Sequence, residues 1–250
     1  MQNGNLPHAP SRLIEQVRQH DSHDPHRASS RLSEIILGGQ DGLVNVLGVI
    51  LGVAAATSDP RIVIAAGMAA TFAESVSMGA VAYTSTLAEH DLYHSERERE
   101  HRHIHIAPDV EMHEIREIYR KKGFEGETLE KIVEVITSNP DIWVNVMMAE
   151  EFQMTPPEKG HALNSALLVG FAALIGSLIP MAPFFFLDVG LSMWLSIAIA
   201  ALTLFVVGAY KARVTVGRPV RSGLQIALIG TVSALVGYGI GLIFKVPTAP

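Results

Sequence analysis

Five stretches of the chain are long and apolar enough to cross a lipid bilayer as helices, and they constrain the fold more than any other feature. A spanning helix needs about 20 mostly apolar residues, because its backbone must satisfy its own hydrogen bonds in lipid. The stretches are Leu32–Thr57, Arg61–Leu87, Ala162–Leu187, Val189–Tyr210 and Ser222–Phe244. The sequence therefore predicts an all-α membrane protein with five transmembrane helices.

Charged residues gather outside these stretches, in a polar N-terminal arm and in one central block. The central block has helical spacing over Glu96–Ile106, Pro108–Lys122, Gly126–Ser138 and Pro140–Met154. We therefore expect a helical insert between the second and third spans. The expected boundaries are an arm at 1–31, spans one and two at 32–88, the insert at 89–160, spans three to five at 161–245 and a tail at 246–250.

The short loops predict the orientation, since Lys and Arg favour the cytoplasmic side of a membrane. Basic residues precede the first span and join the fourth span to the fifth, at Arg12, Arg18, Arg27, Arg31, Lys211, Arg213, Arg218 and Arg221. We therefore expect the N-terminus and the central block in the cytoplasm and the C-terminus outside. Both a bacterial inner membrane and a vacuolar membrane fit this pattern.

The side chains present restrict the chemistry. The chain has no cysteine, which excludes thiol catalysis and thiolate metal sites and leaves His, Asp, Glu and Met as metal ligands. The formal net charge is −6, and no nucleic-acid partner is expected. Four N-terminal histidines either scavenge metal or belong to a polar tail, namely His8, His20, His23 and His26.

The first two spans contain three carboxylates, Glu34, Asp41 and Glu74, and the last two lie well inside their spans. Asp41 and Glu74 stand within otherwise apolar stretches, where a charge costs several kcal/mol unless it meets water, a partner or an ion. Asn45 follows Asp41 by one helical turn, and Met78 follows Glu74 by one turn, so each helix presents a pair of polar or sulfur ligands on one face. This set suits a borderline divalent metal, whereas a helix-end role for Asp41 and simple packing for Met78 remain open.

The central block carries a second set of ligand types. Glu100 and His103 form an E-x-x-H pair on one helix side, and Glu111 and Glu114 repeat the same spacing on the next helix. The last helix of the block adds Met147, Met148 and Glu151. Three helices are thus expected to form one metal cluster, although ordinary surface salt bridges also explain the charges. His101 and His105 fall on a different face from Glu100.

These residues match a known pattern, since the chain resembles the vacuolar iron transporter family from about Arg31 to Lys245. The resemblance rests on Asp41-Gly42-Leu43, on Ser77-Met78-Gly79 with Tyr83, and on Asn139-Pro140 with Trp143 and Met147-Met148. It implies a homodimer with a cytoplasmic metal-binding domain and proton-coupled antiport of Fe²⁺, with Mn²⁺, Zn²⁺ and Co²⁺ as further substrates.

The resemblance also assigns roles to particular residues. Asp41 and Met78 match the translocation residues, whereas the cytoplasmic ligands are matched by Glu100, Glu111, Glu114, Met147, Met148 and Glu151. Two positions depart from the family pattern. Ala82 stands where many relatives have glutamate, and we suspect that Glu74 supplies the missing charge. His103 stands where relatives often carry glutamate.

Two alternatives from other classes stay open beside a transporter without enzymatic activity. The E-x-x-H spacing is also found in membrane-anchored di-iron oxidases, which need a second such motif that this chain lacks. A metal storage or sensing protein would bind metal in the insert without moving it across the membrane.

Overall fold

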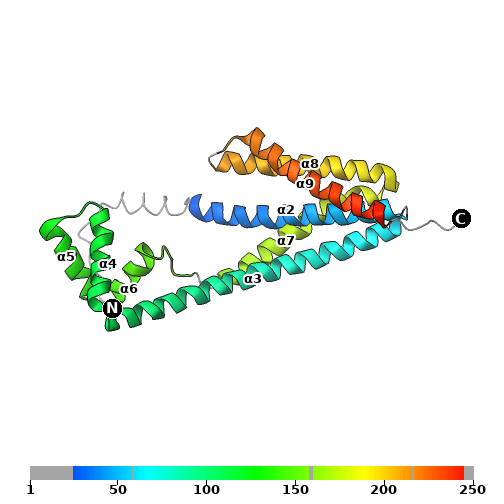
Figure 1. Cartoon of the computed structure of the whole chain (residues 1–250). Coiled ribbons are helices and arrows are strands. Elements are labelled where there is room, and N and C mark those ends of the chain that lie inside the picture. Colours follow the sequence, from blue (N-terminus) through cyan, green and yellow to red (C-terminus); the bar gives the residue numbers. More distant parts are fainter. Residues whose placement is uncertain (1–24, 58, 158–159, 216, 245–250) are drawn as a thin grey trace, which may run out of the picture. The chain divides into compact units, whose positions relative to one another are not determined.

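The computed structural model describes residues 25–57, 59–157, 160–215 and 217–244, and the regular structure in these ranges is helical, without a strand. Figure 1 shows the helices in chain order. They are α2 (Pro25–Ala56), α3 (Pro60–Ile106), α4 (Pro108–Lys121), α5 (Gly126–Thr137), α6 (Pro140–Glu150), α7 (His161–Met181), the 3-10 helix η1 (Ala182–Phe185), α8 (Val189–Val214) and α9 (Pro219–Ile243). The all-α prediction is confirmed.

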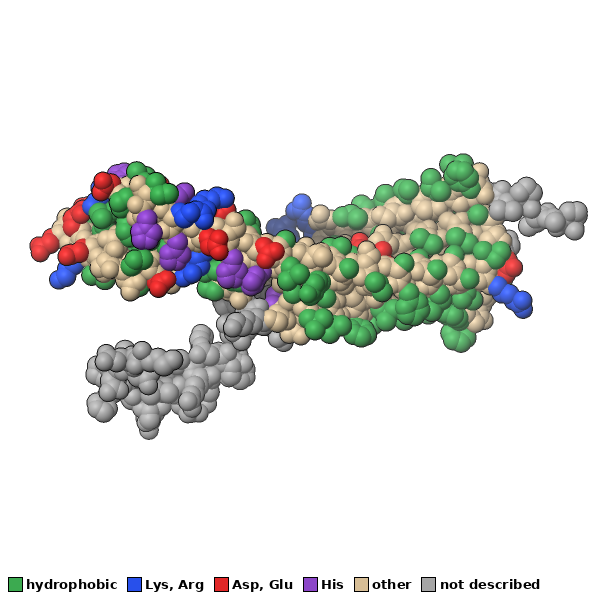
Figure 2. Space-filling view, turned by 90° about the horizontal axis from the view of Figure 1, so that it is seen from below, with side chains coloured by type: hydrophobic (Ala, Val, Ile, Leu, Met, Phe, Trp, Pro, Cys, Tyr) green, Lys and Arg blue, Asp and Glu red, His purple; other side chains and the backbone are tan. Residues whose placement is uncertain are grey.

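Five of these helices are long and apolar enough to cross a membrane, as the sequence predicted. They lie at Leu32–Ala56, Pro60–Ile106, His161–Phe185, Val189–Val214 and Pro219–Ile243. Large apolar side chains on them are exposed, including Trp194, Val76 and Ile243, each more than 70% accessible. In the space-filling view of Figure 2, hydrophobic side chains cover much of the visible surface of these helices. Such a surface is stable in lipid and would aggregate in water.

The chain divides into two compact units, each with its own apolar core. The first unit contains residues up to Ala80 and from Ser165 onward, and the second contains Val81–Asn164. The sequence analysis predicted separate helices over Arg61–Leu87 and Glu96–Ile106, but the structure has one helix, α3, through both. The physical reason is that no Gly or Pro stands between Val81 and Ile106 to interrupt the helical hydrogen bonds.

Close backbone contacts hold the first unit together. Helices α8 and α9 pack side by side, and both pack on α2. At the crossing of α2 and α9, a Cβ atom added to Gly241 would overlap the backbone carbonyl of Gly52, and one added to Gly237 would overlap that of Gly48. Small residues of this kind allow helices to approach closely in lipid, where dispersion contacts and not the hydrophobic effect favour association.

Local contacts mark the start of α3 and the end of α7 in the first unit. The Asp59 carboxylate accepts a hydrogen bond of 2.9 Å from the Arg61 backbone N–H, which starts α3 after a short turn. Pro180 lies in the last turn of α7, and the Ser196 hydroxyl donates a 2.5 Å hydrogen bond to its carbonyl. The α-helix ends one residue later, at Met181, and the chain continues as η1, which contains Pro183.

The helix crossing generates a test with a matched control on the same helix. We expect Gly241→Ala to destabilise the protein by about 1–3 kcal/mol, because the added methyl group must push α2 and α9 apart. Gly239→Ala adds the same methyl group where no atom lies within 4 Å. Thermal unfolding in detergent should show a lower midpoint for the first variant only, and equal midpoints would contradict the close crossing.

Candidate metal-binding site

The candidate site lies in the second unit, where α3 ends and α4 begins. Only Ala107 separates the two helices, and its backbone N–H donates a 2.8 Å hydrogen bond to the His103 carbonyl. Pro108 occupies the first turn of α4, where its missing N–H costs nothing. This short connection brings the first turn of α4, which carries Glu111, against the last two turns of α3.

Three side chains meet at this connection. His103 Nδ1 lies 3.5 Å from a Glu100 carboxylate oxygen and 3.5 Å from a Glu111 carboxylate oxygen. One ligand atom from each of the three residues lies within 4.8 Å of the other two. Small side-chain movements would let all three bind one ion at the usual distance of about 2 Å. The structure thus brings Glu100 and His103 of α3 together with Glu111 of α4, and the predicted metal cluster of three helices stays a prediction.

The two glutamates are buried without full compensation. Glu100 is 2% accessible and Glu111 is 5% accessible, and one carboxylate oxygen of each has no hydrogen-bond partner among the described residues. A buried unpaired carboxylate oxygen is costly, and a bound cation or a proton removes that cost. The burial therefore fits a site that takes up positive charge.

The electrostatics of the cluster point the same way. Burial, together with repulsion by Glu100 and Glu114, raises the pKa of Glu111 to about 7. Glu151, at the end of α6, has a pKa raised above its ordinary value by partial loss of water around its carboxyl group and by the charges of Glu114 and Glu111. Glu114 and Glu151 therefore lie near enough to affect the charge of the cluster. The ligand atoms within 4.8 Å of one another come only from Glu100, His103 and Glu111 among the described residues.

The two methionines take a different position from the carboxylates. Met147 and Met148 are buried at 0% and 1% accessibility in the apolar core of the second unit. The same core contains Ile104 and Ile115, each one turn after a glutamate of the cluster. The methionines therefore form part of the core on which the cluster rests, and their role as sulfur ligands remains a prediction.

A second polar group lies in the first unit, within the predicted spans. The Asn45 side-chain amide donates a 3.2 Å hydrogen bond to an Asp41 carboxylate oxygen, as the spacing of one turn predicted. The Glu74 carboxyl group on α3 lies close to the side chains of both Asp41 and Asn45. Met78 is half-buried one turn further along α3. The structure therefore brings together Asp41, Asn45 and Glu74 from two helices.

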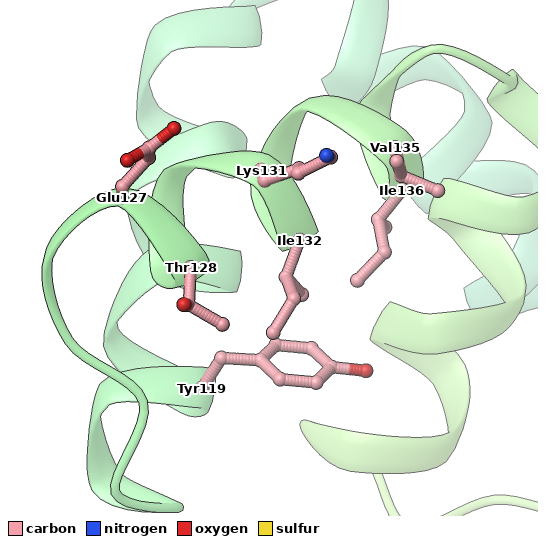
Figure 3. A pocket seen from close by; sticks show the side chains of 7 residues that line it. All are labelled: Tyr119, Glu127, Thr128, Lys131, Ile132, Val135 and Ile136. Atoms are coloured by element: carbon pink, nitrogen blue, oxygen red, sulfur yellow. The ribbon is translucent and has the colours of Figure 1, made fainter.

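A groove on α4 and α5 involves none of the predicted ligands. It is lined by Tyr119, Glu127, Thr128, Lys131, Ile132, Val135 and Ile136. In Figure 3 the Ile132 side chain lies over the Tyr119 ring, and the charged ends of Glu127 and Lys131 point away from the ring. The base of this groove is therefore apolar, and its lining residues do not form a group of converging metal ligands.

Sequence reasoning missed several ion pairs of the second unit. The sequence analysis assigned Glu96 no individual role. In the structure its side chain is buried and pairs with Arg99 at 2.9 Å. Arg97 reaches Asp141 on α6 at 3.3 Å, a contact between helices that no local spacing indicates. The N-terminal histidines proposed as metal scavengers, His8, His20, His23 and His26, lie outside the residues whose side chains the structure describes.

Helices of this length and hydropathy, with their apolar side chains exposed, define a multi-pass membrane protein. The carboxylates within its spans and the cluster at the end of α3 distinguish it from a simple membrane anchor. The chain belongs to the VIT family, whose model matches residues 32–242.

The relatives agree with this assignment along nearly the whole chain. A protein named vacuolar iron transporter 1 from Tulipa gesneriana is 33% identical over 230 residues, which cover 92% of this chain and 93% of the relative. One of the same name from Oryza sativa subsp. japonica is 30% identical over 237 residues, with 94% of each chain covered. A vacuolar iron transporter from Plasmodium falciparum is 28% identical over 224 residues, with 86% of this chain and 82% of the relative covered.

The raised pKa of Glu111 predicts how metal-free stability depends on pH. The folded-state pKa of about 7 exceeds the ordinary value of 4.5, so the unfolded chain loses this proton first as the pH rises. Glu111 therefore costs stability increasingly between pH 4.5 and 7, and fully above pH 7. We expect Glu111→Gln to raise the unfolding midpoint by a few degrees at pH 8 and to change it little at pH 4.5.

The measurement uses the full chain in detergent with a chelator present and Trp194 replaced by Phe. Trp143, buried in the second unit, is then the single fluorescent reporter. Glu130 provides the control, because two hydrogen bonds of 2.8 Å from Arg116 lower its pKa. Glu130→Gln should not stabilise the protein at pH 8, and a similar gain in both variants would contradict the burial argument.

Proposed function

We propose that this protein exports a divalent transition metal, Fe²⁺ first and Mn²⁺, Zn²⁺ or Co²⁺ as further substrates, from the cytoplasm in exchange for protons. The observation that carries the proposal is the proximity of two carboxyl groups, those of Asp41 and Glu74, within the apolar stretches of two helices. Groups of this kind within a bilayer belong to ion or proton pathways by default. The names of the relatives, vacuolar iron transporters, support iron as the substrate.

The exchange follows from competition at the carboxylates. A carboxylate binds either a proton or a metal ion well, and a bound proton must leave before the metal ion can bind. Protons entering from outside would release metal from Asp41 and Glu74, and loss of those protons to the cytoplasm would restore binding. Asn45 holds Asp41 by its hydrogen bond and adds an uncharged oxygen ligand, and Met78 adds a sulfur ligand suited to a borderline metal.

The second unit would collect the metal. In this proposal Glu100, His103 and Glu111 bind the ion first, Glu114 and Glu151 increase the local negative charge, and Met147 and Met148 supply sulfur. The imidazole of His103 is a softer ligand than a carboxylate and shifts the preference of the cluster toward later transition metals. The proposed topology puts this unit and the N-terminus in the cytoplasm and the C-terminus outside.

A homodimer would complete the pathway. Asn45 is exposed in the single chain, close to exposed apolar side chains such as Val49. An exposed amide within lipid is unfavourable, because lipid offers no hydrogen-bond partner to the amide atoms that face it. A second copy that packs against α2 and α3 would cover Asn45 and Asp41 and place two sets of carboxylates along one path.

Transport in proteoliposomes tests the pathway. We expect Asp41→Ala and Glu74→Gln each to reduce Fe²⁺ uptake driven by a pH gradient by about a hundredfold, because either change removes a group at which metal and protons compete. Asp188→Asn is the control, since Asp188 caps α8 through a 3.0 Å hydrogen bond from the Leu191 N–H. Parental rates in both pathway variants would rule the mechanism out.

Equilibrium binding tests the cluster separately. We expect Glu111→Gln to weaken Fe²⁺ binding by about tenfold or more under anaerobic conditions, since one of three converging ligands is lost. Glu127→Gln, an exposed carboxylate in the first turn of α5, should leave the affinity unchanged. Binding without transport would instead support a storage or sensing protein, and oxygen consumption with Fe²⁺ would support the oxidase alternative.

A further inference from the structure

Helix α3 carries a row of histidines that the proposed transport cycle does not use. His90, His94, His101 and His105 lie at positions i, i+4, i+11 and i+15 of one uninterrupted helix. At 3.6 residues per turn these positions fall within about 60° of one another around the helix axis. Figure 2 shows histidine side chains, in purple, following one another on the visible surface. The arrangement is a polar stripe of imidazoles along one helix face.

We propose that His90 and His94 form a second binding site for a divalent transition metal of the zinc, nickel and copper type. Their ring centroids lie 4.4 Å apart, with the planes tilted by 54°. Two imidazoles one turn apart on a helix can each place a nitrogen about 2 Å from the same ion. Both side chains are exposed, so water can complete the coordination shell.

The charges around this pair favour a cation. With three residues included on either side of the pair, segment 87–97 contains three acidic residues, Glu89, Asp91 and Glu96, and one basic residue, Arg97. His90 Nδ1 lies 3.7 Å from an Asp91 carboxylate oxygen. This carboxylate adds negative charge beside the pair, which favours a bound cation.

The second pair of the stripe has the same spacing but different surroundings. The corresponding segment around His101 and His105, 98–108, contains two arginines, Arg99 and Arg102, beside two glutamates. His101 Nε2 is 3.8 Å from an Asp141 carboxylate oxygen, which Arg97 also contacts at 3.3 Å. Guanidinium groups repel a metal ion, and Asp141 is already paired. The local charge therefore favours metal binding at His90 and His94 more than at His101 and His105.

The pair is also distinct from the cluster of Glu100, His103 and Glu111. Glu100 is buried at 2% accessibility, whereas His90 is about half exposed, so the two sets face different sides of α3. Two imidazoles and water suit zinc, nickel and copper, while a carboxylate-rich set suits manganese and iron better. The inference concerns binding alone and stands whether or not the protein transports metal.

Zinc titration of the full chain in detergent tests the site. All variants carry Gln in place of His8, His20, His23 and His26 and lack a histidine tag, which removes competing imidazoles. Calorimetry should find that His90→Gln/His94→Gln binds one zinc ion per chain fewer than this background, or binds that ion at least about tenfold more weakly. His101→Gln/His105→Gln, the matched control, should bind as many zinc ions as the background.

Copper provides a readout that needs no change at the pair. Electron paramagnetic resonance of the His101→Gln/His105→Gln protein with Cu²⁺ should show two equatorial imidazole nitrogens on one ion, whereas the cluster offers only one histidine. An unchanged zinc stoichiometry and affinity in the His90/His94 variant, loss of one zinc ion in the control variant, or a copper signal with fewer than two imidazole nitrogens would each overturn the proposal.

Discussion

A carboxylate that leaves water needs a proton, a donor or a cation, and both polar centres of this protein are arranged around that requirement. Glu100 and Glu111 are buried beside one imidazole, and each keeps an oxygen without a hydrogen-bond donor among the described residues. Asp41 and Glu74 face each other between helices whose other surfaces suit lipid. In both places the protein retains negative charge where apolar side chains would be more stable. Such positions are typical of groups that bind and release a cation.

The apolar framework makes these arrangements possible. In the first unit, glycine contacts at Gly48, Gly52, Gly237 and Gly241 bring the backbones of α2 and α9 so close that α2 has little freedom to shift. In the second unit, Ile104 and Ile115 lie in one core with Met147 and Met148, directly after the glutamates of the cluster. A cluster on packed helices keeps its ligands near one another before any metal arrives, which reduces the ordering cost of binding.

Helix α3 combines three different chemistries along one continuous backbone. Its apolar part contains Glu74, its last turns contain Glu100 and His103, and a separate face presents His90 and His94. Since side chains project every 100° around the axis, a single helix can present a buried acidic side and an exposed imidazole side within about three turns of each other. A break after Leu87 would have separated these faces, and the absence of Gly and Pro from Val81 to Ile106 prevents it.

The sequence by itself determined the five spans, the helices of the insert and the pairing of Asp41 with Asn45, because these depend on local apolar length and on helical spacing. Only the tertiary structure decided which helices meet. The contact of Glu74 with Asp41, the approach of Glu111 to His103 across Ala107, and the pairing of Arg97 with Asp141 join residues whose distance depends on how helices pack. Hydrogen bonds within a helix repeat every turn and can be read from spacing, whereas contacts between helices depend on side-chain packing that no local pattern records.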